Sequence, residues 1–398
     1  MPISSLLLSL FPKRGCFTAA ETGRILVQLR GRAVATHAMF PVMETRPRLE
    51  TALLDDFVLR LRQILAPDWS VRRTRLPQQR LWEPDMVLEI RAPGGIRGRL
   101  AVAVQPRLYP RDVISQRPLW RSLAERMPVL ILTSVLTPRT REVLDEAKLS
   151  YADAVGALRL VMSEPAVSIE HWTGTTRRRP PPERRELQGL RTAAAGRGVR
   201  ALCDLRPPYG VREFATRAGL SPATASRLFD LLDREALIER DSPRSPVKKV
   251  DWARLLRRWA QDYRFETSNR IATFIEPRTL PKLFEKLRTY DEPYAITGSY
   301  AATRWAPIAP PRLVSMFTED VERAARELDL KRTEVGINIV LAEPFDPVVF
   351  ERTQRIDEVT YAAPSQVVAD LLSGPGRAPQ EAEAMLAWMV GHERAWRG

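Results

Sequence analysis

Residues 211–250 constrain the fold of this chain more than any other stretch, because apolar side chains recur there with helical spacing around a single glycine. The first predicted helix carries its apolar residues on one face: Val211, Phe214, Ala215 and Ala218. Gly219 follows as a turn residue, and Ser221 and Pro222 begin a second helix as N-cap and first-turn proline. Two short helices joined by a tight turn are typical of a helix-turn-helix.

The second predicted helix separates into an apolar face and a polar amino end. The apolar positions are Ala225, Leu228, Phe229, Leu231 and Leu232. The exposed residues expected near the amino end, where recognition helices touch base edges, are Ser221, Ala223, Thr224, Ser226 and Arg227. Short polar side chains and one arginine suit contact with DNA bases. The alternative is a helical hairpin packed in a larger core, since this geometry also occurs without DNA.

A basic hairpin is predicted directly after the second helix. Residues 236–240 have the composition of a strand, residues 241–246 form a turn rich in proline and serine, and residues 247–250 return as a basic strand. The side chains expected to lie along phosphates are Arg240, Arg244, Lys248 and Lys249. Together with a preceding helix at residues 199–205, this hairpin predicts a winged helix-turn-helix domain over residues 197–252.

The charge of the whole chain agrees with a polyanion partner. The sequence has 62 Lys and Arg against 48 Asp and Glu, and its formal net charge is +14. Residues 176–196 concentrate arginine around the three prolines 180–182. We interpret this segment either as a solvated linker or as a source of nonspecific phosphate contacts beside the hairpin.

The length of 398 residues predicts two or three domains. Cys16 and Cys203 are the only cysteines, and none of the three histidines has metal-ligand spacing with them, which disfavours structural zinc and Cys/His or Ser/His catalysis. Low cysteine content and the absence of a long apolar run favour a cytoplasmic protein without a membrane partner. Residues 1–43 are expected to be a poorly organised extension, and Met39 or Met43 is an alternative start.

Residues 44–175 are predicted to form an α/β domain. Apolar residues repeat at helical spacing from Leu49 to Leu65, and Pro67 closes that helix. Residues 86–90 and 100–104 alternate as two strands joined by a Pro-Gly-Gly loop, which indicates a hairpin. Residues 129–133 are almost wholly apolar, as expected for a strand in the buried middle of a sheet. A helix is expected over residues 139–148.

This order of elements resembles the restriction-endonuclease-like core. In that family a helix acid, a Pro-Asp and a Glu-x-Lys bind a divalent metal that activates water. Pro84-Asp85 matches the second motif, and Glu50 or Asp55 matches the first, but the third falls on Ala103-Val104-Gln105. Without that carboxylate and lysine, metal-dependent hydrolysis lacks needed groups, and Glu89 lies too far from Asp85 to replace them. The resemblance therefore implies a degenerate core used for folding, dimerisation or nonspecific DNA contact, with a working nuclease as the alternative.

Residues 253–398 are predicted to form a further α+β domain. Strands are expected at residues 294–297, 313–318 and 335–341, with a helix over residues 321–328. Gly298-Ser299 resembles the Gly-Ser of nucleotidyltransferases, but the neighbouring Glu319-Asp320 lacks the Asp-x-Asp spacing that binds magnesium. The alternatives are therefore a nucleotidyltransferase and a tight turn at a helix start.

Most of the chain is similar to actinobacterial regulators related to type IV abortive-infection antitoxins of the AbiEi kind. The similarity depends on residues 136–141, 149–153 and 363–372 with Gly376-Arg377, together with the winged helix. It implies a winged helix joined to a larger carboxy-terminal domain, repression of the protein's own operon, and a nucleotidyltransferase toxin as partner. The chain departs from this pattern in its nuclease-like amino-terminal domain, and Gly156-Ala157 stands where Gly-Asn is expected.

The sequence thus predicts a sequence-specific regulator that binds double-stranded DNA as a homodimer. A repressor of this kind needs no catalytic residue, metal or cofactor. Two alternatives remain open: an antitoxin that acts by contact with a nucleotidyltransferase toxin, and an enzyme of the metal-dependent nuclease or nucleotidyltransferase class.

Overall fold

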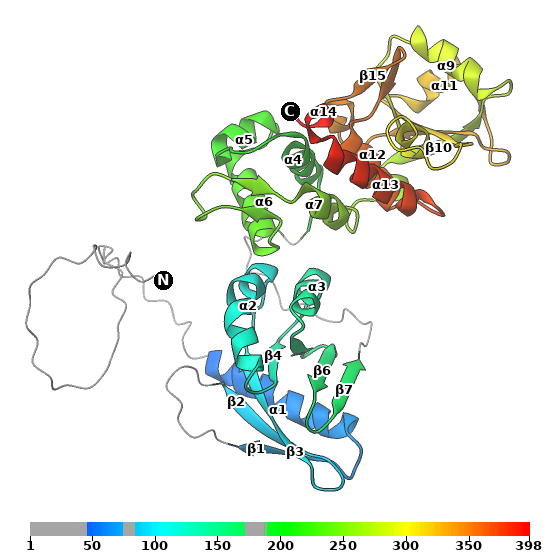
Figure 1. Ribbon diagram of the computed structural model, residues 1–398. Helices are drawn as coiled ribbons and strands as arrows, with labels where there is room; N and C mark the ends of the chain where they lie inside the picture. The colour runs from blue at the N-terminus through cyan, green and yellow to red at the C-terminus, as the bar shows by residue number, and fades with distance from the viewer. Residues whose placement is uncertain (1–45, 75–83, 172–186, 188) are drawn as a thin grey trace, which may run out of the picture. The chain divides into compact units, whose positions relative to one another are not determined.

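The computed structural model describes residues 46–74, 84–171, 187 and 189–398 (Figure 1). It shows a mixed α/β protein with two seven-stranded sheets and a separate two-stranded sheet. The predicted extension at residues 1–43 and most of the predicted linker at residues 176–196 lie outside the described residues. None of the helices in the described part is long and apolar enough to cross a membrane.

The strands of the first sheet lie side by side in chain order. They are β1 (Ser70–Thr74), β2 (Met86–Arg91), β3 (Arg97–Val104), β4 (Val129–Thr133), β5 (Ser150–Asp153), β6 (Leu158–Met162) and β7 (Val167–His171). β4 is parallel to both of its neighbours, and all five of its residues are buried. The predicted central strand is confirmed.

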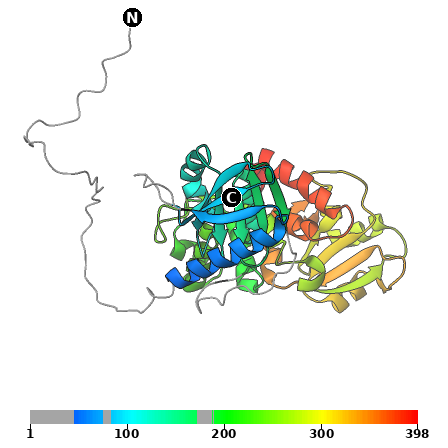
Figure 2. The ribbon, with the colours of Figure 1, turned by 90° about the horizontal axis from the view of Figure 1, so that it is seen from below.

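Alternate residues of β3 build the cores on the two faces of this sheet. Leu100, Val102 and Val104 join the cluster that contains α1 (Arg46–Ile64), whereas Ala101 and Ala103 join the cluster of α2 (Pro110–Ala124) and α3 (Pro138–Glu146). In Figure 2, α1 (blue) runs along one face of the sheet. The predicted helix and the hairpin between β2 and β3 are confirmed. The hairpin turns at Gly94 and Gly95, whose φ angles of 83° and 90° favour glycine.

Three helices and a short hairpin follow. They are α4 (Ala193–Asp204), α5 (Val211–Arg217), α6 (Pro222–Arg234), β8 (Ile238–Glu239) and β9 (Lys249–Val250), and we call them the α4–β9 segment. Gly219 turns the chain between α5 and α6 with a φ of 60°, as the sequence predicted. The two antiparallel strands are shorter than predicted. Ala236 has a φ of 54° and Pro243 and Pro246 lie in the turn, so pairing is confined to two residues on each side.

The second seven-stranded sheet has the order β13-β10-β14-β12-β11-β16-β15. Its strands are β10 (Arg270–Ile275), β11 (Tyr294–Thr297), β12 (Val314–Thr318), β13 (Lys331–Arg332), β14 (Ile339–Glu343), β15 (Gln354–Ile356) and β16 (Val359–Tyr361). The predicted strand at residues 335–341 was placed too early. Residues 334–336 form a bend around Gly336, whose φ is 69°, and the strand begins only at Ile339.

The carboxy-terminal half also contains the helices that follow β9 in the chain, and these share a core with the α4–β9 segment. They are α7 (Trp252–Trp259), α8 (Phe265–Ser268), α9 (Leu280–Arg288), α10 (Gly298–Ala302), α11 (Val321–Glu327), the 3-10 helix η1 (Pro347–Phe350), α12 (Pro364–Leu372), α13 (Ala378–Gly391) and α14 (Glu393–Trp396). One hydrophobic cluster extends from Leu190 to Trp396. The predicted boundary at residues 252 and 253 therefore falls inside a continuous core.

A buried polar network joins α4 to α12 within this core. Arg200 on α4 donates to Asp204 Oδ2 at 3.1 Å and to Gln366 Oε1 at 2.9 Å. Gln366 Nε2 in turn donates to Asp370 Oδ1 at 2.8 Å, and the hydroxyl of Tyr263 donates to the same oxygen at 2.7 Å. Because buried polar groups are costly unless they are paired, these bonds fix α4 to the carboxy-terminal half in one orientation.

Candidate nucleic-acid interface

The amino end of α6 carries the residues that the sequence predicted for base contact. Ser221 caps the helix, and its Oγ accepts from Thr224 N at 3.2 Å. Ser221, Ala223 and Arg227 are exposed, whereas Thr224 and Ser226 are half-buried. Arg227 donates to Ala223 O at 3.3 Å and to Thr224 Oγ1 at 3.4 Å, so its guanidinium lies back along the same amino end. The structure brings these five residues together on one turn and a half of helix.

The opposite face of α6 is fully packed. The five apolar residues predicted to be buried are all buried: Ala225, Leu228, Phe229, Leu231 and Leu232. The ring of Phe229 packs at a tilt of 46° against Phe214 of α5, with 4.9 Å between the ring centroids, and this contact helps to fix the angle between the two helices. Leu228 lies against Gly198 of α4 so closely that a Cβ at Gly198 would come within 2.3 Å of Leu228 Cδ2. The position of α6 is therefore set by α4 and α5.

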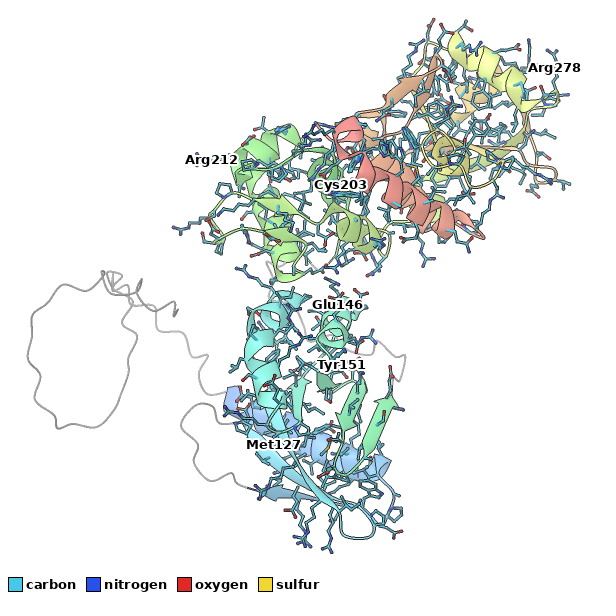
Figure 3. All side chains as sticks on the ribbon, in the orientation of Figure 1. Met127, Glu146, Tyr151, Cys203, Arg212 and Arg278 are labelled. Carbon is cyan, nitrogen blue, oxygen red and sulfur yellow. The ribbon has the colours of Figure 1, made fainter. Side chains whose placement is uncertain are left out.

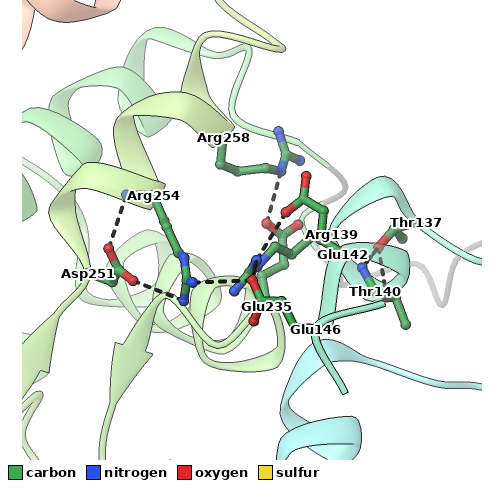
Figure 4. Close-up of polar contacts among 9 residues, drawn as sticks. All are labelled: Thr137, Arg139, Thr140, Glu142, Glu146, Glu235, Asp251, Arg254 and Arg258. Atoms are coloured by element: carbon green, nitrogen blue, oxygen red, sulfur yellow. Dashed lines mark hydrogen bonds and ion pairs between the residues drawn. The ribbon is translucent and has the colours of Figure 1, made fainter. Parts of the chain in front are cut away.

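Helix α7 holds the carboxyl end of α6. Arg258 donates to Glu235, the residue that ends α6, at 2.9 Å, and Asp251 caps α7 by accepting from Arg254 N at 3.1 Å (Figure 4). Arg258 is also bonded to Asp262 at 2.9 Å. With its carboxyl end held and its amino end polar and exposed, α6 presents a rigid helix end to solvent.

Arg240 does not lie where the sequence placed it. We predicted a phosphate contact, but the side chain is only 1% exposed and pairs with Asp230 at 2.6 Å and with Asp233 at 3.2 Å. It also donates to Pro243 O at 2.8 Å, which secures the turn of the hairpin. Arg240 is therefore a structural residue that ties β8 to α6.

The other three predicted cations of the hairpin are exposed. Lys248 pairs with Asp241 at 2.6 Å and Lys249 pairs with Glu239 at 3.2 Å, and all four side chains are more than half exposed. Exposed pairs of this kind contribute little to stability, so a phosphate can replace the carboxylate at small cost. Arg244, on the turn, has no carboxylate partner among the described residues.

Several arginines of the α4–β9 segment have no carboxylate partner in the part of the chain that the structure describes. Within residues 193–250, four arginines have no carboxylate partner among the described residues: Arg206, Arg212, Arg227 and Arg244. All four are exposed. Figure 3 shows Arg212 projecting from α5. Sequence reasoning missed Arg206 and Arg212, although helical spacing gives a signal: Arg217 has Glu213 one turn before it, whereas Arg212 has no acid at that spacing.

Three acidic residues of the nuclease-like and transferase-like motifs, Asp85, Asp55 and Asp320, are bonded to other groups of the protein. Asp85 Oδ2 accepts from Val104 N at 2.7 Å, and Asp55 pairs with Arg73. Asp320 caps α11 by accepting from Arg323 N at 2.9 Å and lies beyond the end of β12. Gly298 opens α10 with a φ of 66°. Across the described ranges, no three His, Cys, Asp or Glu side chains gather closely enough to hold a metal ion.

Comparison with known proteins adds no further constraint. No family model matches the chain, and no curated protein or solved structure matches it. A proposal for its function therefore depends on the residues and contacts described above.

Proposed function

We propose that the α4–β9 segment is a winged helix-turn-helix that binds double-stranded DNA, with α6 in the major groove. The single observation that carries this proposal is the amino end of α6. It exposes short side chains and one arginine that has no carboxylate partner, while the other face of the helix is buried. A guanidinium on such a helix end reads guanine through two parallel hydrogen bonds. The half-buried hydroxyls of Thr224 and Ser226 lie beside it.

Electrostatics supports the same surface. Arg212 and Arg244 are free to contact phosphates, and Lys248 and Lys249 join them once DNA displaces their exposed acids. Arg206 is exposed and has no carboxylate partner among the described residues, but its guanidinium donates to Glu393 O at 3.1 Å. A formal net charge of +14 draws a polyanion toward the protein before any specific contact forms. Arg240 has no part in this contact, because its charge is neutralised inside the protein.

We further propose that the protein acts as a dimeric transcriptional repressor. The charged helix end and the hairpin support DNA binding, and the similarity to AbiEi-type antitoxins supports repression of the protein's own operon. A dimer would read a palindrome, since each winged helix contacts one half-site. In this proposal the amino-terminal sheet is a restriction-endonuclease-like core without its chemistry, and the second sheet resembles that of nucleotidyltransferases without their metal-binding pair. A toxin partner belongs to the same proposal.

The test is a gel-shift assay with the DNA upstream of the coding sequence. The proposal expects a shift in the presence of a chelator, weakened about tenfold or more on replacing Arg227 by Ala and unchanged in Arg278→Ala. Arg278 is a matched control because it is exposed and its guanidinium lies on the loop before α9, outside the candidate interface. Magnesium-dependent nicking that disappears in Asp85→Asn would instead identify a nuclease, and copurification with a protein encoded next to this one would identify an antitoxin that acts by contact.

A further inference from the structure

A surface depression lies beside α4, on the side of the polar network. Its volume is about 640 Å³, and its wall is formed by the start of α4, the end of α7, α8 and Phe345. Three aromatic rings form one side. Trp259 stacks on Tyr263 with 4.7 Å between the ring centroids. The ring centroid of Phe345 lies 5.1 Å from that of Tyr263 and 6.1 Å from that of Trp259. The backbone N–H of Phe345 donates to the side-chain Oδ1 of Asn269 at 2.8 Å, and this bond holds the third ring in place.

The polar side of the depression carries excess positive charge. Burial raises the pKa of Asp262, but hydrogen bonds from Leu190 N and Arg258 outweigh it and hold the pKa below its usual value, so this carboxylate stays ionised. Two arginines, Arg191 and Arg258, neutralise it. Arg264 also lines the depression, is exposed, and has no side-chain partner among the described residues. One guanidinium is therefore available to a ligand.

We propose that this depression binds a small organic anion, a carboxylate or phosphate ester with a planar apolar body, and that the bound anion changes the affinity for DNA. Arg264 pairs with the anionic group, and the exposed hydroxyl of Thr267 donates to it. The apolar body lies against Phe345, the half-buried ring of the aromatic wall. Trp259 and Tyr263 are buried, so Phe345 is the ring of this wall that is open to a ligand.

Helix α4 provides the connection from this depression to the DNA-binding helix. Gly196 packs on the depression side so closely that a Cβ there would lie 2.6 Å from Phe345 Cε2, and Gly198 packs on α6 just as closely. Tyr263, in the aromatic wall, belongs to the network that reaches Arg200 of α4 through Gln366. A ligand that displaces Phe345 or Tyr263 thus moves α4, and α4 sets the position of α6. This coupling depends on the proposed DNA binding; the anion site does not.

The site is tested first without DNA, by thermal unfolding of the full chain with benzoate or phenyl phosphate, and with sulfate at equal ionic strength. At about ten times the dissociation constant, one of the two organic anions should raise the Tm by about 3 °C. The shift should disappear in Arg264→Ala and persist in Arg278→Ala. No shift with either organic anion, or an equal shift with sulfate or in Arg264→Ala, overturns the proposal.

The coupling is tested by fluorescence anisotropy on a DNA fragment that the protein binds. A saturating amount of the active anion should change the Kd by at least about fivefold, and DNA should change the Kd of the anion by the same factor. If the anion binds but the Kd for DNA does not change, the proposed effect of the anion on DNA binding is overturned. If the chain binds no DNA but the thermal shift remains dependent on Arg264, the proposed function fails and the anion site stands.

Discussion

Asp230 is bound to Arg240, at 2.6 Å, and not to Arg227, which lies one turn earlier on the same helix. Spacing of three residues would otherwise allow Arg227 and Asp230 to pair. Because Arg240 holds Asp230 from the hairpin side, the guanidinium of Arg227 keeps no carboxylate partner among the described residues. The hairpin thus determines whether the proposed base-reading side chain is free.

We predict that Arg240→Ala lowers the free energy of unfolding by about 3 kcal/mol, because it leaves the buried Asp233 without one of its cations. It should also weaken DNA binding indirectly, since Asp230 becomes free to pair with Arg227. Urea denaturation measures the first effect. Arg244→Ala is the control. Because the side chain of Arg244 is exposed, the free energy of unfolding of this variant should stay within about 0.5 kcal/mol of the wild type. Equal losses in the two variants would contradict the assignment of Arg240.

Gly198→Ala is expected to lower the free energy of unfolding by about 1–3 kcal/mol, because the new Cβ would lie 2.3 Å from Leu228 Cδ2 in a packed core. Gly391→Ala, at the exposed last residue of α13 with open space around it, should instead leave stability within about 0.5 kcal/mol of the wild type. Both values can be read from the same denaturation series. If Gly198→Ala were neutral, α6 would not be positioned by this contact.

Stability should depend on pH through Asp370. Burial raises the pKa of this carboxyl from its ordinary value to about 6, although Thr297, Tyr263 and Gln366 donate to it. Between pH about 4 and 6 the folded chain therefore holds a proton that the unfolded chain has released. The contribution of Asp370 to the free energy of unfolding is greatest at acid pH and is lost as the pH rises through 6.

The corresponding test compares wild type with Asp370→Asn, which mimics the protonated form. The two proteins should be similar in stability near pH 4. At pH 7.5 the free energy of unfolding of the variant should exceed that of the wild type by up to about 3 kcal/mol, which corresponds to a shift of about two pKa units. A difference that does not change with pH would show that Asp370 does not titrate in this range.

Contacts with DNA should fall into two classes. Arg227→Ala should lose about 1–3 kcal/mol of discrimination at one base pair and leave the other positions unchanged. Arg212→Ala and Arg244→Ala should weaken all sequences alike and reduce the slope of log K against log salt by about 0.9 each. Anisotropy titrations over a series of single-base variants and salt concentrations separate the two classes. Identical behaviour of all three variants would leave no basis for a recognition helix.

Local pattern was enough to predict α5, α6 and the central strand β4, because each of these elements repeats its buried side chains with its own period. Long-range pairs gave no such signal. Gln366 bonds to Arg200 across 166 residues, and nothing in either neighbourhood distinguishes these two side chains from solvated ones. Arg240 was misplaced for the same reason: in a basic hairpin it looks like a surface cation, and its acids lie on the preceding helix.

The central claim is that α6 reads DNA sequence, and selection from a random duplex pool by the full chain in the presence of a chelator tests it most directly. The account predicts an enriched palindrome whose half-sites lie about 10 base pairs apart, or a multiple of that spacing. In Arg227→Ala one base pair of each half-site should lose its preference. A pool without any enriched sequence, or the same motif selected by wild type and Arg227→Ala, would contradict the claim.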